Sequence, residues 1–291
     1  MDVVRPEFVP DASLSREDME ALQREIAETA VFANDLPFDP ATVCRDGDAE
    51  TVTDAGQTSL DALGDAVGGD EGDGTESMDA ESTDPPLVAG VDQAFVDDHA
   101  VSAIVLLRGG EVVERAYAVE PVEIPYIPGL LSFREGTAIL SAFELLSRDP
   151  DLALLDGSGR IHFREAGIAT HVGVTLDLPT VGVAKSLLCG TPRESLDRKL
   201  LAGARVAVEA DADVETAAPG THIGDAVQTR QFENSERYIN PLIVSPGHRV
   251  SADTASDVAL ACAAGYKLPE PTRLADQYAD DVKAEVREEL S

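Results

Sequence analysis

The stretch that decides the fold runs from residue 87 to residue 119 and reads LVAGVDQAFVDDHAVSAIVLLRGGEVVERAYAV. It holds three short apolar runs, at residues 87–91, 101–107 and 112–119. The second and third runs are separated by Arg108-Gly109-Gly110-Glu111, a typical turn sequence. Short runs joined by tight turns favour neighbouring antiparallel strands. This stretch therefore predicts a three-stranded antiparallel meander.

Beyond the meander, strands and helices alternate. Residues 130–146 predict a helix, 152–155 a buried strand ending at Asp156, 166–175 a helix and 180–184 another strand. Alternation of this kind implies parallel pairing from residue 152 onward. Further elements are predicted from the same patterns: helices at 14–33, 253–264 and 273–289, and strands at 204–208, 223–229 and 242–244. This order is that of the ribonuclease H-like fold, an α/β mixed sheet with helices on both faces.

The charge balance is strongly acidic. The 291 residues include 55 Asp and Glu against 22 Lys and Arg, a formal net charge of −33, and 43% of them are hydrophobic, enough for a sizeable core. Such a chain repels phosphates, which excludes a generic basic nucleic-acid coat but not a nuclease with a locally arranged site. Molar salt screens carboxylate repulsion, so we expect a halophilic source. An ordinary acidic protein with a disordered tail is the alternative.

Part of the acidity is concentrated in one segment. Residues 46–84 contain 13 Asp or Glu and no Lys or Arg, with too little apolar surface to offset the entropy of ordering. We therefore expect an N-terminal helical segment at 1–40, an acidic disordered insert at 41–86 and a catalytic domain at 87–291.

The cysteines and the N-terminus bear on the compartment. Cys44, Cys189 and Cys262 are odd in number and widely spaced, so we expect reduced, buried thiols. The first ten residues lack the basic start and apolar run of a signal peptide, and no 18-residue apolar stretch occurs. A cytoplasmic protein without a membrane partner is expected.

Two carboxylates stand out because they are embedded in apolar sequence. Asp92 interrupts the first run of the meander, and Asp156 ends the run at 152–155. A buried carboxylate is costly unless it is paired or bound to a metal. Two of them converging from neighbouring strands suit Mg²⁺ or Mn²⁺. Taken singly, each could instead cap a turn at the end of a strand.

Six segments in order resemble the endonuclease V family of deoxyinosine-specific repair nucleases. The resemblance covers about residues 87–270. It is carried by Gly90-Val91-Asp92, the segment PYIPGLLSFRE at 125–135, LDGSG at 155–159, GIATHVG at 167–173, PTVGVAKS at 179–186 and SPGHRVS at 245–251.

The resemblance implies a set of catalytic residues. Asp92 and Asp156 match the metal-binding aspartates, Glu135 the acidic residue that completes the site, and Lys185 the lysine near the scissile phosphate. His248 matches the late histidine or aspartate near the metal. Lys185 could instead be an ordinary surface lysine, and His248 a hydrogen-bonded loop histidine.

The resemblance also implies residues that handle the base. Pro125, Tyr126, Ile127 and Pro128 match a wedge that enters the duplex beside the lesion, although such a proline-rich turn could also tuck Tyr126 into the core. The pocket for the everted base would be lined by Gly129, Leu131, Gly157, Ile168 and Gly182. The chain departs from the family at Phe163, where a proline is usual, and after Asp92, where Gln93-Ala94 replaces a small polar pair. Phe163 could alter the loop near the pocket.

These matches imply a Mg²⁺-dependent endonuclease, with Mn²⁺ as an alternative ion. It would evert deoxyinosine in DNA and nick the second phosphodiester bond on the 3′ side. An inosine-specific endoribonuclease and a binding module that does not cleave are the alternatives. We expect a monomer.

Overall fold

The computed structural model describes residues 1–44, 84–233 and 238–289, and among these residues one nine-stranded sheet is surrounded by five α-helices. The strands are β1 (Leu87–Val96), β2 (His99–Arg108), β3 (Glu111–Pro121), β4 (Leu152–Asp156), β5 (Thr180–Ala184), β6 (Thr191–Pro192), β7 (Arg205–Glu209), β8 (His222–Val227) and β9 (Leu242–His248). The helices are α1 (Arg16–Thr29), α2 (Leu131–Glu144), α3 (Ile168–Leu176), α4 (Ala252–Ala261) and α5 (Glu270–Glu289), with short 3-10 helices η1 (Pro6–Phe8) and η2 (Pro40–Thr42). Within these ranges no helix is both long and apolar enough to cross a membrane.

The sheet has the order β3-β2-β1-β4-β5-β9-β8-β7-β6. The first three strands pair antiparallel, which confirms the predicted meander. β4 returns parallel to β1 after α2, and β5 returns parallel to β4 after α3. The other four strands add antiparallel, so the mixed sheet is confirmed but the parallel pairing expected after residue 152 stops at β5. The described residues between β7, β8 and β9 form no helix, and parallel neighbours need a long crossover connection.

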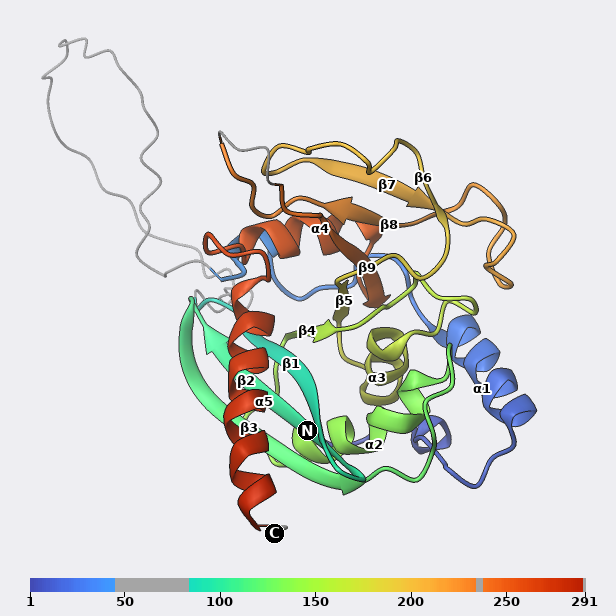
Figure 1. Cartoon of the computed structure of the whole chain (residues 1–291), viewed down its shortest axis with the longest axis vertical. Helices are drawn as coiled ribbons and strands as arrows, with labels where there is room; N and C mark the ends of the chain where they lie inside the picture. The colour runs from blue at the N-terminus through green and yellow to red at the C-terminus, as the bar shows by residue number, and fades with distance from the viewer. Residues whose placement is uncertain (45–83, 234–237, 290–291) are drawn as a thin grey trace, which may run out of the picture.

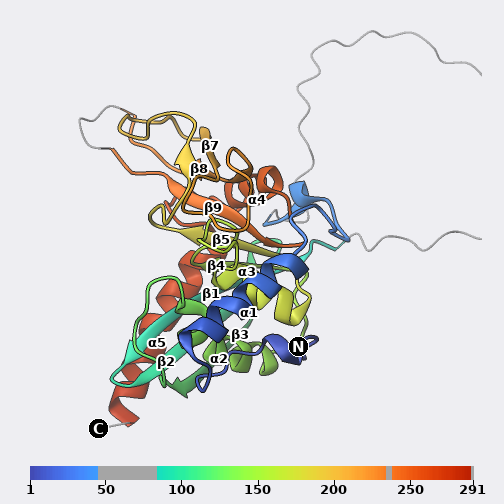
Figure 2. The ribbon, with the colours of Figure 1, turned by 90° about the vertical axis from the view of Figure 1, so that its right-hand side faces the viewer.

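Helices cover both faces of the meander, as expected (Figures 1 and 2). Side chains alternate between the faces of a strand. Ala94 and Val96 of β1 therefore pack with Ala279 of α5, whereas Val91 packs with Ile139 of α2 on the opposite face. Even-numbered residues of β1 thus face α5, and this decides where the Asp92 carboxylate points.

The N-terminal segment packs against the sheet domain instead of standing apart from it. The Ser15 side chain caps α1 by accepting a hydrogen bond from the Asp18 amide. Ile26 of α1 is fully buried in a cluster with Phe8, Ala166 and Val174, and α1 lies beside α3 (Figure 2). The N-terminal helix predicted at 14–33 is confirmed.

Most of the expected acidic insert, residues 45–83, lies outside the described residues. Residues 41–44 of the expected insert are described, and because Val43 among them is fully buried, the packed N-terminal segment extends past the boundary set at 41. Pro40–Thr42 form η2, and Val43 is fully buried in the cluster formed by β4, β5, β9 and α4.

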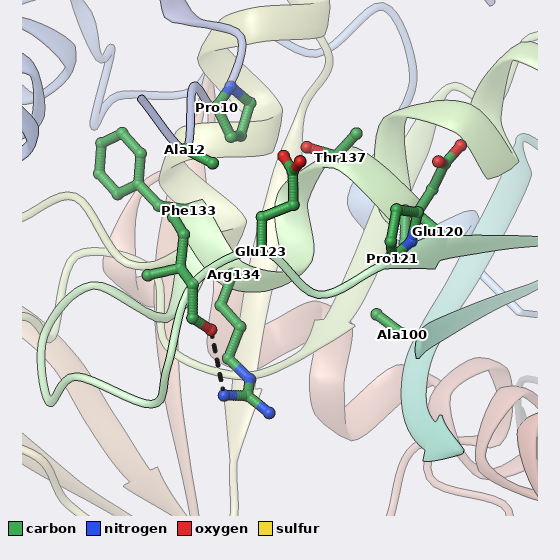
Figure 3. Close-up of a pocket in the computed structure, with 11 residues that line it drawn as sticks. Pro10, Ala12, Ala100, Glu120, Pro121, Glu123, Phe133, Arg134 and Thr137 are labelled. Carbon is green, nitrogen blue, oxygen red and sulfur yellow. Dashed lines mark hydrogen bonds between the residues drawn. The ribbon is translucent and has the colours of Figure 1, made fainter. Parts of the chain in front are cut away.

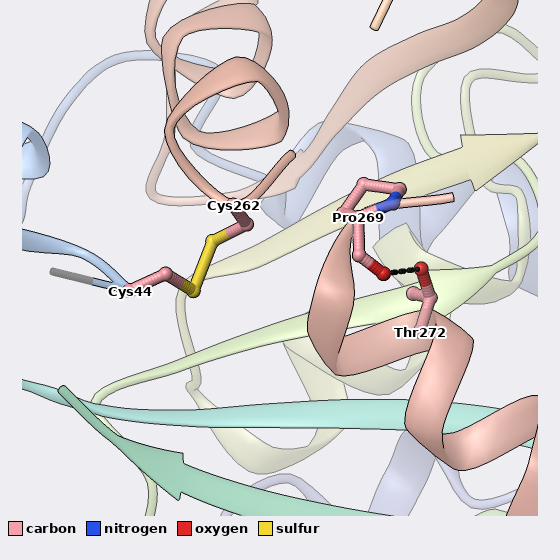
Figure 4. The surroundings of a disulfide bond; sticks show 4 residues. All are labelled: Cys44, Cys262, Pro269 and Thr272. Atoms are coloured by element: carbon pink, nitrogen blue, oxygen red, sulfur yellow. Dashed lines mark hydrogen bonds between the residues drawn. A yellow bond between two sulfur atoms is a disulfide. The ribbon is translucent and has the colours of Figure 1, made fainter. Parts of the chain in front are cut away.

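A disulfide joins Cys44 to Cys262 across 218 residues of sequence, so the expectation of three reduced thiols is wrong for this pair. Figure 4 shows the bond beside Pro269 and Thr272, at the start of α5. The Cys262 carbonyl also accepts a hydrogen bond from the Glu270 amide. Wide spacing hid the pair, since only the folded chain brings η2 to the end of α4. Cys189 is a free, buried thiol, as expected.

Candidate active site

Three carboxylates meet where β1, β4 and α5 come together. One ligand oxygen each from Asp92, Asp156 and Asp276 lies within 4.8 Å of the other two. The parallel register pairs Val91 with Leu155, which brings the next residues of the two strands, Asp92 and Asp156, side by side. The sheet supplies two of the acids and the facing helix the third.

Gly90 allows α5 to come this close to the sheet. A Cβ atom at Gly90 would lie 1.9 Å from the Pro271 carbonyl oxygen, which is less than any van der Waals contact permits. Only glycine at this position therefore lets the first turn of α5 pack on β1. Asp276 lies in the following turn of α5. The glycine two residues before Asp92 is thus required by the packing that brings Asp276 to the site.

The three acids of the cluster carry more negative charge than the one lysine beside them, Lys185, offsets. Asp92 is only 8% exposed. Burial, then the charge of and hydrogen bond to Asp156, then the charge of Asp276 raise the pKa of Asp92 to about 8, against the opposing effect of Lys185. A carboxyl in this state holds a proton at neutral pH until a cation replaces it.

Lys185 is the cation at the mouth of the cluster. Its Nζ lies 2.8 Å from Asp156 Oδ2 and 3.7 Å from Asp276 Oδ1, and its side chain is about half exposed. Burial opposes the charge of Lys185, but the hydrogen bond to Asp156 and the neighbouring carboxylates raise its pKa above the usual range. Lys185 is therefore charged at neutral pH and pairs with two of the three acids, and its role at the scissile phosphate stays a prediction.

Glu135 approaches the cluster from the other face of the sheet. It lies in the second turn of α2 and is 6% exposed. Burial, opposed by the charge of Arg134 and assisted by that of Asp156, raises the pKa of Glu135 to about 7. A carboxyl with a pKa near neutrality is suited to proton transfer.

The structure corrects the expectation for His248. This residue pairs with Thr180 at the start of β5, whereas Asp156 pairs with Val183 near its end, so His248 lies at the opposite end of the strands from the acids. Its ring is buried and fully used: Nδ1 accepts from the Val31 amide, and Nε2 lies 3.2 Å from Asp177 Oδ1. The alternative of a hydrogen-bonded histidine therefore holds.

Asp276 takes the place that sequence reasoning gave to His248. The signal for it was weak, because Asp276 is one acid among many in a charged helix. Asp276 does lie next to the buried face of α5, which is formed by Thr272, Ala275 and Ala279. Its position beside this buried face distinguishes Asp276 from the exposed acids of the same helix.

A second metal-compatible group, His222, Asp225 and Asp253, lies between β8 and α4. Asp225 is buried, but its oxygens are already bonded to His222 Nε2 at 2.9 Å and to Ser256 Oγ at 2.6 Å. These partners satisfy the carboxylate without an ion, in contrast to Asp92.

The segment Pro125, Tyr126, Ile127 and Pro128 forms a projecting loop between β3 and α2. Tyr126 is 67% exposed, so it is not tucked into the core. Ile127 is partly buried against Ile124, Leu130 and Phe133, which anchors the base of the loop. A ring presented on an anchored, proline-flanked loop can insert into another molecule with little entropy to lose.

A cavity of about 140 Å³ lies behind this loop, lined by Glu120, Pro121, Glu123 and the start of α2 (Figure 3). Arg134 crosses it, donating to the Ile124 carbonyl and stacking over the Phe95 ring. None of the three clustered aspartates lines this cavity, so it is separate from the acidic site.

The structure brings three of the five expected pocket residues into direct contact. A Cβ atom at Gly157 would lie 2.5 Å from Ile168 Cγ2, and one at Gly182 would lie 2.7 Å from the Gly157 carbonyl oxygen. Gly157 directly follows Asp156, so this group adjoins the acids. Leu131, partly exposed, begins α2.

Gly129 lies next to Phe163, the residue at which the chain departs from the family pattern. It has a φ of +82°, and a Cβ atom there would lie 3.2 Å from the Phe163 ring. Its carbonyl accepts hydrogen bonds from Gln23 and His162. Phe163 therefore does border the loop that leads to α2, and Gln23, which sequence reasoning missed, reaches it from α1.

Comparisons with known proteins agree with this geometry. The sequence model of the Endonuclease V family matches residues 74–277. Endonuclease V of the halophilic archaeon Haloarcula marismortui is 60% identical over 97% of this chain and 98% of its own. The crystal structure of the Streptomyces avermitilis enzyme superposes with a TM-score of 0.66 at 29% identity, over 98% of this chain and 99% of that one.

A third relative carries a nucleic acid. The endonuclease V of Ciona intestinalis, solved with a 24mer DNA containing an inosine, has the same fold, with a TM-score of 0.62 at 21% identity over 93% of this chain and 98% of that one. The family match, the near full-length archaeal relative and the shared fold lead to one conclusion. This chain belongs to the endonuclease V family, nucleases that act on phosphodiester bonds.

Proposed function

We propose that this protein is a Mg²⁺-dependent DNA repair endonuclease that everts deoxyinosine and nicks the second phosphodiester bond on its 3′ side. The observation that carries the proposal is the convergence of Asp92, Asp156 and Asp276 around Lys185, in a member of the endonuclease V family. The inosine-containing DNA in the complex of the Ciona enzyme supports the choice of lesion.

The donor set fits a hard divalent cation. Three carboxylates offer oxygen ligands within 4.8 Å of one another, and burial, followed by the charges of Asp156 and Asp276, raises the pKa of Asp92. Asp92, Asp156 and Asp276 would hold Mg²⁺, with Mn²⁺ as the alternative ion. When bound, the ion supplies Lewis-acid polarisation of the phosphate and a lower pKa for a bound water.

The side chains around the cluster have separate tasks in hydrolysis. Lys185, half exposed at its mouth, holds the scissile phosphate and offsets the charge that develops on its oxygens. Glu135, with a pKa of about 7, takes the proton released by the attacking water. Because Glu135 is buried, that proton does not exchange freely with solvent.

The projecting loop and the adjoining glycines handle the base. Tyr126 enters the duplex and replaces the stacking that the everted nucleotide gives up. Gly157, Ile168 and Gly182, with Gly129 and Leu131 beside them, line the pocket for hypoxanthine. Backbone groups at glycines approach the base edge closely, and a donor facing the carbonyl of hypoxanthine rejects the amino group of adenine. The protein acts as a cytoplasmic monomer.

One nicking assay tests the proposal. Duplex DNA with a single deoxyinosine, the same duplex with uracil and an RNA of the same sequence with inosine are incubated with Mg²⁺ in molar KCl. We expect a nick at the second bond 3′ to deoxyinosine and slower cleavage of the other two. Asp156→Asn should abolish the nick, whereas Asp280→Asn, an exposed acid one turn beyond Asp276, should leave it unchanged.

Other outcomes identify the alternatives. Preferential cleavage of the RNA would make the protein an inosine-specific endoribonuclease. Tight binding of inosine DNA without any nick would make it a binding module, and full activity in Asp156→Asn would remove the carboxylate cluster from the mechanism.

A further inference from the structure

We propose that Gln23 is a positioning residue of the active site, which fixes the starts of α2 and α3 relative to each other and thereby places Glu135 and the loop at 125–128. The inference deepens the proposed function and rests on it for the identity of the substrate. It assigns a part of the site to α1, outside the residues matched by the family model.

Gln23 is a buried polar residue on an otherwise amphipathic surface helix. Its exposure is 0%, and its neighbours on the inner face of α1 are the apolar Met19 and Ile26. Nε2 donates to the Gly129 carbonyl at 2.8 Å and to the Ala166 carbonyl at 3.4 Å, while Oε1 accepts from Arg164 Nε at 2.8 Å. Both amide hydrogens and the amide oxygen are thus in use, and apolar packing needs none of these bonds.

The two carbonyls lie at the entrances of two helices. Gly129 ends the projecting loop and precedes Leu130, the residue before α2; the Leu130 amide closes the loop onto the Ile127 carbonyl. Ala166 precedes Gly167, the N-cap of α3, and the next residue, Ile168, contacts Gly157. One side chain therefore ties the start of the helix that carries Glu135 to the start of the helix whose first residue, Ile168, contacts Gly157.

A second route through the same network also ends at Gly129. The Arg164 amide donates to His162 Nδ1 at 3.3 Å, and His162 Nε2 lies 3.1 Å from the Gly129 carbonyl oxygen. With Nδ1 accepting, Nε2 carries the proton and is the donor to Gly129. Arg164 is buried and takes part in both sets of hydrogen bonds, through its backbone amide to His162 and through its guanidinium to Gln23. The guanidinium is itself fixed by Glu215, because its NH1 donates to Glu215 Oε1 at 3.0 Å.

Convergence of two donors on one glycine carbonyl argues for a positional role. Gly129 has a left-handed backbone conformation at the junction of an exposed loop and a helix, a place where the chain can otherwise pivot. A displacement of about 1 Å in a catalytic group can cost about 10²-fold in rate. Holding this junction is therefore a means of keeping Glu135 in register with the acids on the sheet.

The test compares Gln23→Glu, Gln23→Met and Glu28→Gln. Gln23→Glu keeps the shape and the acceptor for Arg164 but turns the amino donor into an oxygen facing two carbonyls. Gln23→Met keeps the apolar bulk and removes all three bonds. Glu28→Gln changes one exposed residue of the same helix and is the matched control.

Three measurements separate positioning from stability. Unfolding midpoints define a temperature at which every variant is fully folded. At that temperature, single-turnover nicking of saturating inosine duplex with Mg²⁺ should fall about 10²-fold in both Gln23 variants and stay within twofold of the wild type in Glu28→Gln. Hydrogen exchange should accelerate in peptides covering residues 129–135 and 166–170 in the Gln23 variants alone.

Folded Gln23 variants with wild-type rates and unchanged exchange at both helix starts would overturn the inference. Loss of rate only in proportion to unfolded protein would do the same. A wild-type protein that leaves inosine DNA uncut would instead contradict the proposed function, and the exchange measurement would still decide whether Gln23 holds the two helix starts.

Discussion

Binding of Mg²⁺ to the metal-free protein is expected to release protons at neutral pH. The pKa of Asp92 is raised to about 8 and that of Glu135 to about 7 by burial and by the charge of Asp156. At pH 7 a carboxyl of pKa 8 is about 0.9 protonated and one of pKa 7 about half protonated. A cation held by Asp92 must displace its proton, so we expect release of about 0.9 proton at pH 7, more if Glu135 also ionises, and about 0.1 at pH 9.

The raised pKa of Asp92 also makes the stability of the metal-free protein depend on pH. Because the folded-state pKa of Asp92 is above its unfolded value of 3.8, the folded protein binds more protons than the unfolded chain between about pH 4 and pH 8. The free energy of unfolding of the metal-free protein should therefore fall as pH rises through this window, by at most about 1.4 kcal/mol per pH unit from this group. Saturating Mg²⁺ should remove that contribution, since the bound form needs the carboxylate ionised.

The assay is calorimetric titration of the EDTA-stripped protein with Mg²⁺ in molar KCl, in pairs of buffers of different ionisation enthalpy, from pH 6 to pH 9. In Asp276→Asn one neighbouring negative charge is lost, so proton release at pH 7 should shrink. Asp280→Asn, exposed on the same helix, should titrate like the wild type. A proton release of zero at pH 7, or one that is the same at every pH, would refute the reasoning.

Five further outcomes are expected. Asp276→Asn should lower nicking of inosine DNA at least about 10²-fold, because the interaction of two unit charges at about 4 Å is worth about 4 kcal/mol at an effective dielectric of 20. His248→Gln should keep the nicking rate. It should lower the free energy of unfolding, measured with denaturant, by about 1–3 kcal/mol, because it disturbs the hydrogen bonds to Val31 and Asp177. Dithiothreitol should lower the unfolding midpoint of the wild type, because it reduces the Cys44–Cys262 disulfide, but not that of the Cys44→Ser/Cys262→Ser double variant. On a chain-entropy estimate, a disulfide that closes a loop of this length adds up to about 5 kcal/mol to the free energy of unfolding. Tyr126→Ala should change the free energy of unfolding by less than about 0.5 kcal/mol, since the ring is exposed, and yet slow nicking of duplex substrate about tenfold or more, with a smaller effect on single-stranded inosine DNA. Nicking should persist in molar KCl and decline at low salt, and a loss of activity on raising KCl from low to molar levels would contradict this.

Most of the fold could be predicted because its elements have local signals. The meander at 87–119 has apolar runs separated by turn residues, and the helices and strands between 130 and 184 alternate in a way that leaves few topologies. The pairing direction after β5 was predicted wrongly because the alternation was extended past its last helix. The absence of a helical pattern between 204 and 244 already favoured antiparallel neighbours.

The site was predictable to the extent that its residues break an apolar pattern. Asp92 and Asp156 interrupt buried strands, and the register of two parallel strands brings them together. Asp276 lies in a charged helix where an extra acid is unremarkable, and only the approach of α5 to Gly90 gives it a role. Gln23 and the Cys44–Cys262 pair depend in the same way on contacts between segments more than 100 residues apart.

The net charge of −33 and a polyanionic substrate are reconciled at the cluster itself. Arginines near the site are largely occupied by acids of the protein: Arg160 pairs with Glu165, Arg164 with Glu215 and Arg273 with Glu270. Three carboxylates and Lys185 carry a formal charge of about −2 when fully ionised, which repels a phosphate. One divalent cation cancels that charge, so DNA and metal should bind cooperatively. Because the protein surface is acidic, binding of DNA at the active site should depend on the bound cation. A duplex without a lesion should bind weakly, since the rest of the protein surface offers it little electrostatic attraction.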